Sequence, residues 1–435
     1  MSRDNGYVDP GRKTFLGVSS FQALAMFRRG LFYSYLSIYL RAYLGLSVTE
    51  TTFFAAFPMV VNIIFQMFVW GVVSDRYQKR RTLIILGEIS AAVITFLVWL
   101  VHSWSASPRT AGYAIIIGFT VVEIFWSMSN VSWTALLSDL YPGYKRAGIQ
   151  GKLFTVGGAG RIIGVWIGGL AYDGMSRYYE GWGFEEGFLF FVASGVMLLS
   201  TIPMFFLPEG GVPGAKKDEG GGKPGGRILE LSSYSKVYFL FLVAMILLNF
   251  GKNGVTLLKT QYLVLDEGFD VSSTMLSYVV NMRSVAICLG GLLIGRLTDW
   301  FNDQRVLMSG AIVSILSLLG FALSRVLWAI FVSNFLYGLA QVVVRASAYS
   351  YASKLIPPRH RGKQFALFNA TFYLSWGLAG TLIFGPIVDL LIGSGATQVF
   401  SYRTSFAASA VLVLGGMLVL LRANRMRALM KTEEY

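Results

Sequence analysis

Apolar residues fall in repeated blocks of about 20 or more positions, separated by short polar segments. An α-helix needs about 20 apolar residues to cross roughly 30 Å of hydrocarbon, so each block predicts one membrane span. The pattern therefore predicts an all-α membrane protein with twelve transmembrane helices. The expected spans cover residues 14–42, 51–72, 82–103, 111–137, 150–172, 187–206, 236–263, 271–296, 305–323, 326–352, 364–392 and 402–421.

The segment between the sixth and seventh spans has the composition of a linker. It reads LPEGGVPGAKKDEGGGKPGGR over residues 207–227, and is rich in glycine, lysine and proline. Segments of this kind connect packed domains without packing themselves. We expect an N-terminal six-helix bundle over residues 1–206, a cytoplasmic linker over 207–235 and a C-terminal six-helix bundle over 236–435.

Composition and charge placement agree with a membrane protein and predict its orientation. The chain is 54% hydrophobic and 14% charged, whereas a soluble protein has about a quarter charged residues. The net charge of +14 comes from cations clustered in loops on one side of the predicted spans, which is the positive-inside pattern and not a nucleic-acid surface. Both termini are therefore predicted to be cytoplasmic, in a cell (inner) membrane. The polar first 13 residues predict no cleavable signal peptide.

Two loop signatures occur once in each half of the chain, in the same order. GVVSDRYQKRR (Gly71 to Arg81) follows the second span, and GRLTDWFNDQR (Gly295 to Arg305) follows the eighth. SDLYPGYKRAG follows the fourth span, and SKLIPPRHRG follows the tenth. Internal repeats are typical of transporters, because two similar bundles can move about a site between them.

The first of these signatures resembles the loop between the second and third helices of the major facilitator superfamily. The matching residues are Gly71, Asp75, Arg76, Arg80 and Arg81, with a weaker copy at Gly295, Asp299 and Arg305. With twelve spans and a central linker, the resemblance covers the full chain. It implies two pseudo-symmetric six-helix bundles that work by alternating access, with the matching residues forming a cytoplasmic gate.

A glycine-rich stretch in the fifth span raises drug export as an alternative. GRIIGVWIGG, residues 160–169, resembles the antiporter signature of the same family, except that Val165 stands where that signature has proline. The missing proline counts against drug export. The glycines also permit close packing of helices, so the stretch has a purely structural explanation as an alternative.

Several ionisable residues lie within the predicted spans, and most of them are cations. Such a residue costs at least a few kcal/mol in a membrane and usually faces a cavity or a partner. The cations are Arg28, Arg29, Arg161, Lys252, Arg283 and Arg345, and Glu123 is the one obvious acid. This excess favours an anionic substrate, because Arg and Lys replace the hydration of a carboxylate or phosphate with charge-assisted hydrogen bonds.

The seventh span carries a polar stripe along one helical face. Its polar positions recur at steps of three and four residues and are Asn249, Lys252, Asn253, Thr256 and Lys259. When FRRG is aligned with GKNG, Arg28 lies opposite Lys252 and Arg29 opposite Asn253. Spans 1 and 7 both line the central cavity in the superfamily. The resemblance therefore implies one cation from each half, a placement similar to that in organophosphate antiporters.

Spans 4 and 10 add to the predicted substrate site. Glu123 and Asn130 share one face of span 4, and Gln341 and Arg345 share one face of span 10. The aromatic residues Tyr33 and Trp126 are candidates for stacking on an organic substrate, since their depth matches that of Arg29 and Glu123. Glu123 is also the candidate proton carrier.

Most of these residues have a structural alternative. Arg28 and Arg29 point about 100° apart on a helix, so one of them can pair with Glu123 instead of binding substrate. Arg161 can bind a neighbouring backbone carbonyl, and the apolar neighbours of Arg283 leave its role open. Arg41 and Lys259 are expected near the outer interface, with their side chains snorkelling to water.

The sequence predicts no enzyme, cofactor or metal site, since it has no phosphate-binding Gly-Lys-Ser/Thr motif and its two histidines are isolated. We expect a secondary transporter of a small organic anion, driven by proton coupling or anion exchange. The alternatives are a proton-coupled exporter of lipophilic drugs and a non-transporting sensor with a transporter fold. The expected partners are an anionic small molecule and the lipid bilayer, without nucleic acid, and the protein is expected to be a monomer.

Overall fold

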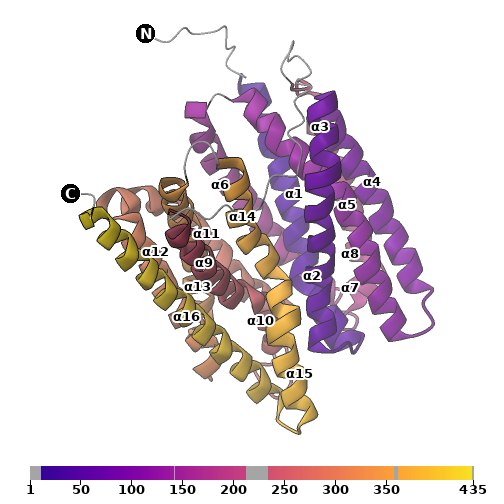
Figure 1. The fold of residues 1–435 in the computed structure, drawn as a ribbon. Coiled ribbons are helices and arrows are strands. Elements are labelled where there is room, and N and C mark those ends of the chain that lie inside the picture. Colours follow the sequence, from indigo (N-terminus) through magenta and orange to yellow (C-terminus); the bar gives the residue numbers. More distant parts are fainter. Residues whose placement is uncertain (1–10, 142, 212–233, 357–360, 434–435) are drawn as a thin grey trace. The chain divides into compact units, whose positions relative to one another are not determined.

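A computed structural model of the protein describes residues 11–141, 143–211, 234–356 and 361–433, and every regular element in these residues is a helix (Figure 1). The first half contains α1 (Arg12–Ile38), η1 (Tyr39–Tyr43), α2 (Val48–Phe65), η2 (Gln66–Trp70), α3 (Gly71–Tyr77), α4 (Arg80–Ser103), α5 (Pro108–Leu140), α6 (Gly143–Tyr172), α7 (Trp182–Glu185) and α8 (Phe188–Phe205). The second half contains α9 (Tyr234–Gly254), α10 (Thr256–Leu263), α11 (Ser273–Trp300), α12 (Asp303–Leu323), α13 (Leu327–Leu355), α14 (Arg361–Tyr373), η4 (Leu374–Trp376), η5 (Gly380–Phe384), α15 (Gly385–Gly393) and α16 (Gln398–Glu433).

The described helices account for the twelve predicted spans. Ten of them are long and apolar enough to cross a membrane, and the pair Leu367–Trp376 with Gly380–Gly393, bent by 47°, forms one more. The remaining predicted span, residues 14–42, falls mostly on α1, which is 27 residues long. Its hydropathy is lower because it carries Arg28, Arg29 and several serines. The predicted all-α membrane fold is confirmed.

Contacts divide the chain into two compact units. The first unit comprises residues 1–33 and 60–221, and the second comprises residues 34–59 and 222–435. Within the first unit, α4 packs against α5 and α8 (Figure 1). Within the second unit, α16 packs against α9 and α12, and α13 packs against α11 and α12. The predicted bundles over residues 1–206 and 236–435 remain a prediction.

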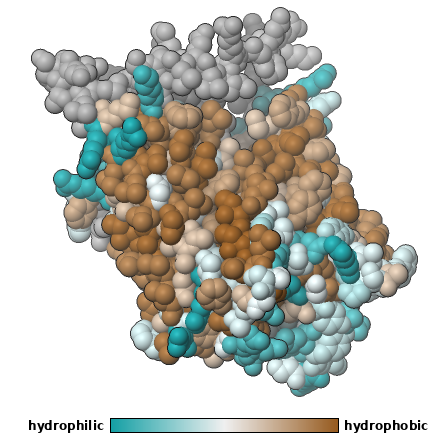
Figure 2. Space-filling model, turned by 60° about the horizontal axis from the view of Figure 1, so that its bottom comes forward, coloured by the Kyte–Doolittle hydropathy of each residue, from teal (hydrophilic) through white to brown (hydrophobic). Residues whose placement is uncertain are grey.

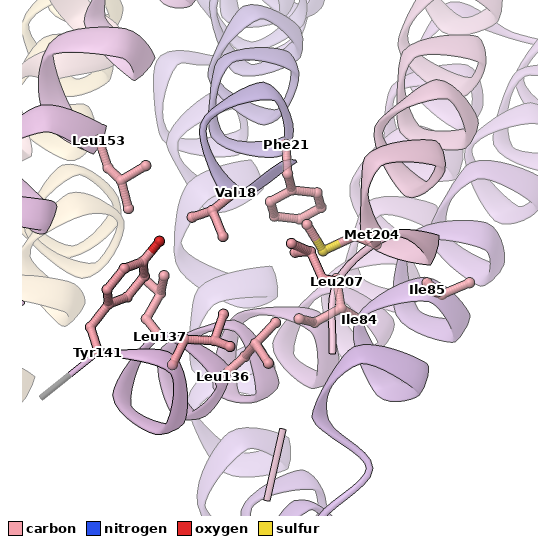
Figure 3. Packing of buried hydrophobic residues seen from close by; sticks show 11 residues of the cluster. Val18, Phe21, Ile84, Ile85, Leu136, Leu137, Tyr141, Leu153, Met204 and Leu207 are labelled. Atoms are coloured by element: carbon pink, nitrogen blue, oxygen red, sulfur yellow. The ribbon is translucent and has the colours of Figure 1, made fainter. Parts of the chain in front are cut away.

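A buried apolar cluster holds the helices of the first unit together (Figure 3). Figure 3 shows Val18 and Phe21 of α1 facing side chains from several other helices of the unit. The remaining members are Ile84, Ile85, Leu136, Leu137, Leu140, Tyr141, Leu153, Met204 and Leu207. Close packing of this kind, rather than apolar character alone, is what drives helices together in a lipid environment.

The glycine-rich stretch of α6 packs against the backbone of α1 within the first unit. A Cβ on Gly164 would lie 2.0 Å from the backbone oxygen of Phe27, and one on Gly160 would lie 2.4 Å from that of Ala23. A Cβ on Gly30 of α1 would in turn lie 2.5 Å from the backbone oxygen of Arg161. These small residues therefore allow the two helix backbones to approach closely.

The second unit includes the start of α2, whose first turn is capped by a side chain from α15. The carboxylate of Asp389 accepts hydrogen bonds from the backbone N–H of Val48 (2.9 Å) and of Thr49 (2.8 Å). A carboxylate at a helix N-terminus satisfies unpaired N–H groups and favours the helix dipole. Further along the same helix, a Cβ on Gly377 would lie 2.2 Å from the Cα of Ala56. These contacts explain why residues 34–59 group with the second unit.

The surface has the hydropathy expected of a membrane protein. In Figure 2, brown hydrophobic residues cover most of the visible face, and teal hydrophilic residues gather towards its edges. Exposed apolar side chains occur on many helices, among them Phe68 of η2, Leu292 of α11 and Leu390 of α15. Side chains of this kind are stable when they contact lipid tails.

Replacing Gly164 with alanine tests the α1–α6 contact. The added methyl would meet the Phe27 backbone oxygen, which no side-chain rotation can move, so Gly164→Ala should destabilise the protein by about 1–3 kcal/mol. Thermal unfolding in detergent measures this loss. The matched control is Gly195→Ala in α8, where a Cβ would meet nothing within 4 Å. Equal melting temperatures for the two variants would contradict the packing described.

Candidate functional site

In the first unit, Arg28 forms a buried ion pair with a residue that the sequence did not single out. Its Nη1 lies 2.7 Å from Oε2 of Glu88 on α4, and both side chains are less than 5% exposed. Glu88 also accepts hydrogen bonds from Ser129 Oγ (2.8 Å) and from Trp126 Nε1 (3.4 Å), both on α5. The Arg28 guanidinium lies 3.8 Å from the centre of the Trp126 ring. Arg28 is therefore held by a network within the protein.

Glu88 was not among the predicted site residues, although the sequence shows that it is an acid within a predicted span. It lies inside the predicted span 82–103, where an acid is as unusual as the cations that drew attention. The expected pairing partner of the arginines was Glu123, whereas the structure pairs Arg28 with Glu88.

Arg29 is the exposed member of the arginine pair, in contrast to Arg28. Its guanidinium lies 5.7 Å from the centre of the Trp126 ring, and its charge acts on the carboxyl of Glu123. Glu123 is half-buried and accepts a 2.6 Å hydrogen bond from Asn62 Nδ2, which sequence reasoning also missed. The Tyr33 ring lies 5.9 Å from that of Trp126. Arg29, Tyr33, Glu123 and Trp126 thus come together on the first unit, as expected from the sequence.

Asn130 and Arg161 lie further along α5 and α6. Both side chains are half-buried. The backbone of Arg161 belongs to the close α1–α6 contact, because its carbonyl oxygen lies next to Gly30.

The second unit contains four cations that lie close together, named here the cationic cluster: Lys252, Lys259, Arg283 and Arg345. Lys252 is 1% exposed, Lys259 is 5% exposed and Arg283 is 7% exposed, whereas Arg345 is exposed. The charge of Arg283 acts on both lysines, and that of Arg345 acts on Lys252. The prediction that Lys259 snorkels to the interface is wrong, because its side chain is buried.

One aromatic ring lies beside Lys259 and Arg283. Lys259 Nζ lies 3.4 Å from the centre of the Tyr337 ring, and the Arg283 guanidinium lies 5.0 Å from the same centre. Phe321 is a second aromatic neighbour of Lys259, at 4.6 Å. The hydroxyl of Tyr337 shares a 2.9 Å hydrogen bond with Thr256 Oγ1, which fixes the ring.

A second ring lies beside Lys252 and Arg345. The Arg345 guanidinium lies 4.5 Å from the centre of the Phe372 ring, and Lys252 Nζ lies 6.0 Å from it. The Trp376 ring adds a third aromatic surface, 5.1 Å from the Arg283 guanidinium. The cationic cluster is therefore interleaved with aromatic rings.

Within the described residues, no carboxylate forms an ion pair with any member of the cationic cluster. Arg283 donates from Nε to Oε1 of Gln341 (3.0 Å), but Lys252 Nζ and Lys259 Nζ have no hydrogen-bond partner among these residues. A buried ammonium without a partner costs several kcal/mol. An anion bound in the cluster would offset this cost, because it would compensate the positive charge and accept hydrogen bonds from the ammonium groups.

The remaining polar residues of the seventh span bond to neighbouring helices. Asn249 Nδ2 donates to Thr371 Oγ1 (3.2 Å), and Asn253 Nδ2 donates to Ser375 Oγ (2.8 Å). Both asparagines are at most 2% exposed. These bonds fix α9 against α14 and η4, and thereby orient Lys252.

The signature loop of the first unit forms a charge network around Arg80. Its guanidinium contacts Ser74 Oγ (2.5 Å), Asp75 Oδ1 (3.2 Å) and Asp139 Oδ2 (3.5 Å). Arg81 pairs with Glu209 at 3.0 Å. A Cβ on Gly71 would lie 2.9 Å from the backbone oxygen of Gln66, and the Arg76 guanidinium lies 5.8 Å from the centre of the Tyr77 ring.

The weaker signature copy is only partly described. The surroundings of Gly295 and the side chain of Asp299 lie outside the described residues, and Arg305 is exposed. The ion pair found there is between Asp303, at the start of α12, and Lys354, near the end of α13. The corresponding pair of the first unit has its cation, Arg80, at the start of α4 and its acid, Asp139, at the end of α5. The charges of the two pairs are thus reversed.

Comparison with known proteins agrees with this fold. The model of the Major Facilitator Superfamily matches residues 18–381 and 263–433. Multidrug resistance protein MdtG of Enterobacter lignolyticus (strain SCF1) is 22% identical over 348 residues, 79% of this chain and 75% of its own length. The multi-drug resistance efflux pump PmrA homolog of Lactococcus lactis subsp. lactis (strain IL1403) is 20% identical, covering 80% of this chain and 78% of its own.

Solved structures show the same architecture. The nucleoside transporter NupG superposes with a TM-score of 0.71 at 14% identity, covering 94% of this chain and 98% of its own. The human organic anion transporter MFSD10 (TETRAN) superposes with a TM-score of 0.59 at 14% identity, covering 94% and 99%. The chain belongs to the Major Facilitator Superfamily and is a multi-pass membrane transporter, not an enzyme.

Replacing Glu88 tests the buried pair. Glu88→Gln leaves the Arg28 charge buried without a counter-charge, which should cost about 3–5 kcal/mol of stability. The double variant Arg28→Gln/Glu88→Gln removes both charges and should recover most of that loss. Thermal or denaturant unfolding in detergent measures Glu88→Gln, Arg28→Gln and the double variant, with exposed Glu267→Gln as control. A double variant as unstable as the sum of its singles would show that the pair is not coupled.

Proposed function

We propose that the protein is a secondary transporter of small organic anions that carry a carboxylate or phosphate group. The observation that carries this proposal is the cationic cluster, in which buried Lys252 and Lys259 lack any acidic partner among the described residues. An anion binds to such a group through charge-assisted hydrogen bonds. The interleaved rings of Tyr337, Phe372 and Trp376 suit the apolar part of an organic anion better than a bare inorganic ion.

The polar face of the first unit is assigned two roles in this proposal. Exposed Arg29, near Trp126 and Tyr33, contributes to anion binding, whereas buried Arg28 positions Trp126. Glu123 is the proposed proton carrier, because it is half-buried and the charge of Arg29 acts on its carboxyl. The network around Arg80 is proposed to be a cytoplasmic gate, and both termini are proposed to lie in the cytoplasm.

Drug export is the second candidate. The relatives named multidrug resistance proteins favour it. The glycines of α6, which first suggested it, have a packing role against α1. A lipophilic cation would also be repelled by the cationic cluster. We therefore rank anion transport first.

Ligand-induced stabilisation distinguishes the two candidates. Purified protein would be heated with phenyl phosphate, citrate, a neutral nucleoside or tetraphenylphosphonium. Binding to the folded state stabilises it by about 2.7 kcal/mol at a hundredfold excess over Kd, so an anion should raise the melting temperature. The shift should vanish in Lys252→Gln and Arg345→Gln but persist in the control Lys236→Gln, an exposed lysine of the same α9. A shift with tetraphenylphosphonium alone would favour drug export.

Replacing Glu123 tests proton coupling. In proteoliposomes, Glu123→Gln should abolish anion uptake driven by a pH gradient, because glutamine cannot carry a proton. Exchange of labelled for unlabelled anion without a gradient should persist, which shows that the variant is folded and binds substrate. Glu267→Gln, an exposed acid, serves as the control. Retained pH-driven uptake in Glu123→Gln would remove this residue from the coupling role.

A further inference from the structure

The cationic cluster consists of two pairs, each arranged around its own aromatic ring. Lys252 and Arg345 flank Phe372, and Lys259 and Arg283 flank Tyr337. We name them the Phe372 pair and the Tyr337 pair. The two lysines are seven residues apart along α9 and α10, so their backbone positions differ by about 10 Å along the helix axis at 1.5 Å per helical residue. The cluster therefore presents two positive positions rather than one.

A single anionic group can satisfy one of these pairs but leaves the other uncompensated. Lys259 shows the problem most clearly, because it is 5% exposed and its Nζ has no hydrogen-bond partner among the described residues. The rings of Tyr337 and Phe321 attract its charge but accept no conventional hydrogen bond from it. Three N–H donors of the ammonium are thus left for a ligand.

Cations with a structural role in the same unit look different. Arg41 donates from Nη1 to the backbone oxygen of Leu46 at 2.8 Å. Arg403 donates from Nη2 to the backbone oxygen of Ser324 at 2.7 Å and from Nε to the hydroxyl of Tyr262 at 2.9 Å. Both are bonded within the protein and serve its fold. Lys259 has no such bond, so its position is better explained by a ligand than by the fold.

We propose that the preferred substrate is a dianion whose two anionic groups are held apart by a rigid or aromatic body. One group binds the Phe372 pair, and the other binds the Tyr337 pair. The body lies against the aromatic rings between them, with Trp376 as a third surface. This inference rests on the proposed anion transport and specifies the substrate class of that same site.

Matched rigid probes test this inference on the full-length protein in detergent. Biphenyl-4,4′-dicarboxylate carries two carboxylates about 10 Å apart, which is close to two turns of an α-helix. Biphenyl-4-carboxylate carries only one carboxylate on the same rigid body. Terephthalate and benzoate form a shorter pair. Calorimetric titration should show that biphenyl dicarboxylate binds at least tenfold more tightly than biphenyl carboxylate. The ratio for terephthalate over benzoate should be much smaller.

The variant Lys259→Gln should bring the biphenyl ratio close to one, because it removes the ammonium that binds the second carboxylate. Lys236→Gln, exposed on α9, should preserve the ratio. Equal affinities of the native protein for the two biphenyl probes would overturn the dianion inference. This result would not contradict the proposed anion transport. Failure of all four carboxylates to bind, alongside binding of tetraphenylphosphonium, would overturn the proposed function itself.

Discussion

A charge buried in a membrane protein must be compensated, and the two units of this transporter meet that constraint in different ways. In the first unit the compensation is internal, because Glu88 pairs with Arg28 at 2.7 Å and is itself bonded by Ser129. In the second unit the members of the cationic cluster have no acidic partner among the described residues. The first arrangement makes a rigid support, whereas the second makes a site that is more stable when an anion occupies it.

Other contacts in each unit support this difference in charge compensation. The glycines of α6 let α1 pack closely against it, and Arg28 of α1, paired with Glu88, lies against Trp126 beside exposed Arg29. In the second unit, the asparagines of α9 form hydrogen bonds to Thr371 and Ser375. These bonds fix the rotation of α9 and thereby orient the Lys252 side chain. A transporter site for an anion must keep some of its positive charge uncompensated. A site whose charges were already paired within the protein would gain little free energy from binding the substrate.

The helices could be predicted from the sequence because the thickness of a membrane sets their length, and apolar blocks record that length directly. That Tyr33 and Trp126 lie near Arg29 and Glu123 was expected from their matching depth in the spans. The Arg28–Glu88 pair did not follow, because a sequence gives no rotation of α4 relative to α1. The burial of Lys259 was also missed, since only the fold shows that Tyr337 and Phe321 enclose it. Which of the two arginines is buried depends on the same rotation.

The most direct test of the central claim is exchange across a membrane. Proteoliposomes preloaded with unlabelled phenyl phosphate would be placed in labelled phenyl phosphate, and the entry of label followed over time. The account predicts entry that other organic anions inhibit, that tetraphenylphosphonium does not inhibit, and that Lys252→Gln abolishes. Entry of labelled tetraphenylphosphonium with no entry of the anion, unchanged in Lys252→Gln, would contradict the account. Binding of the anion without any entry would identify a sensor instead of a transporter.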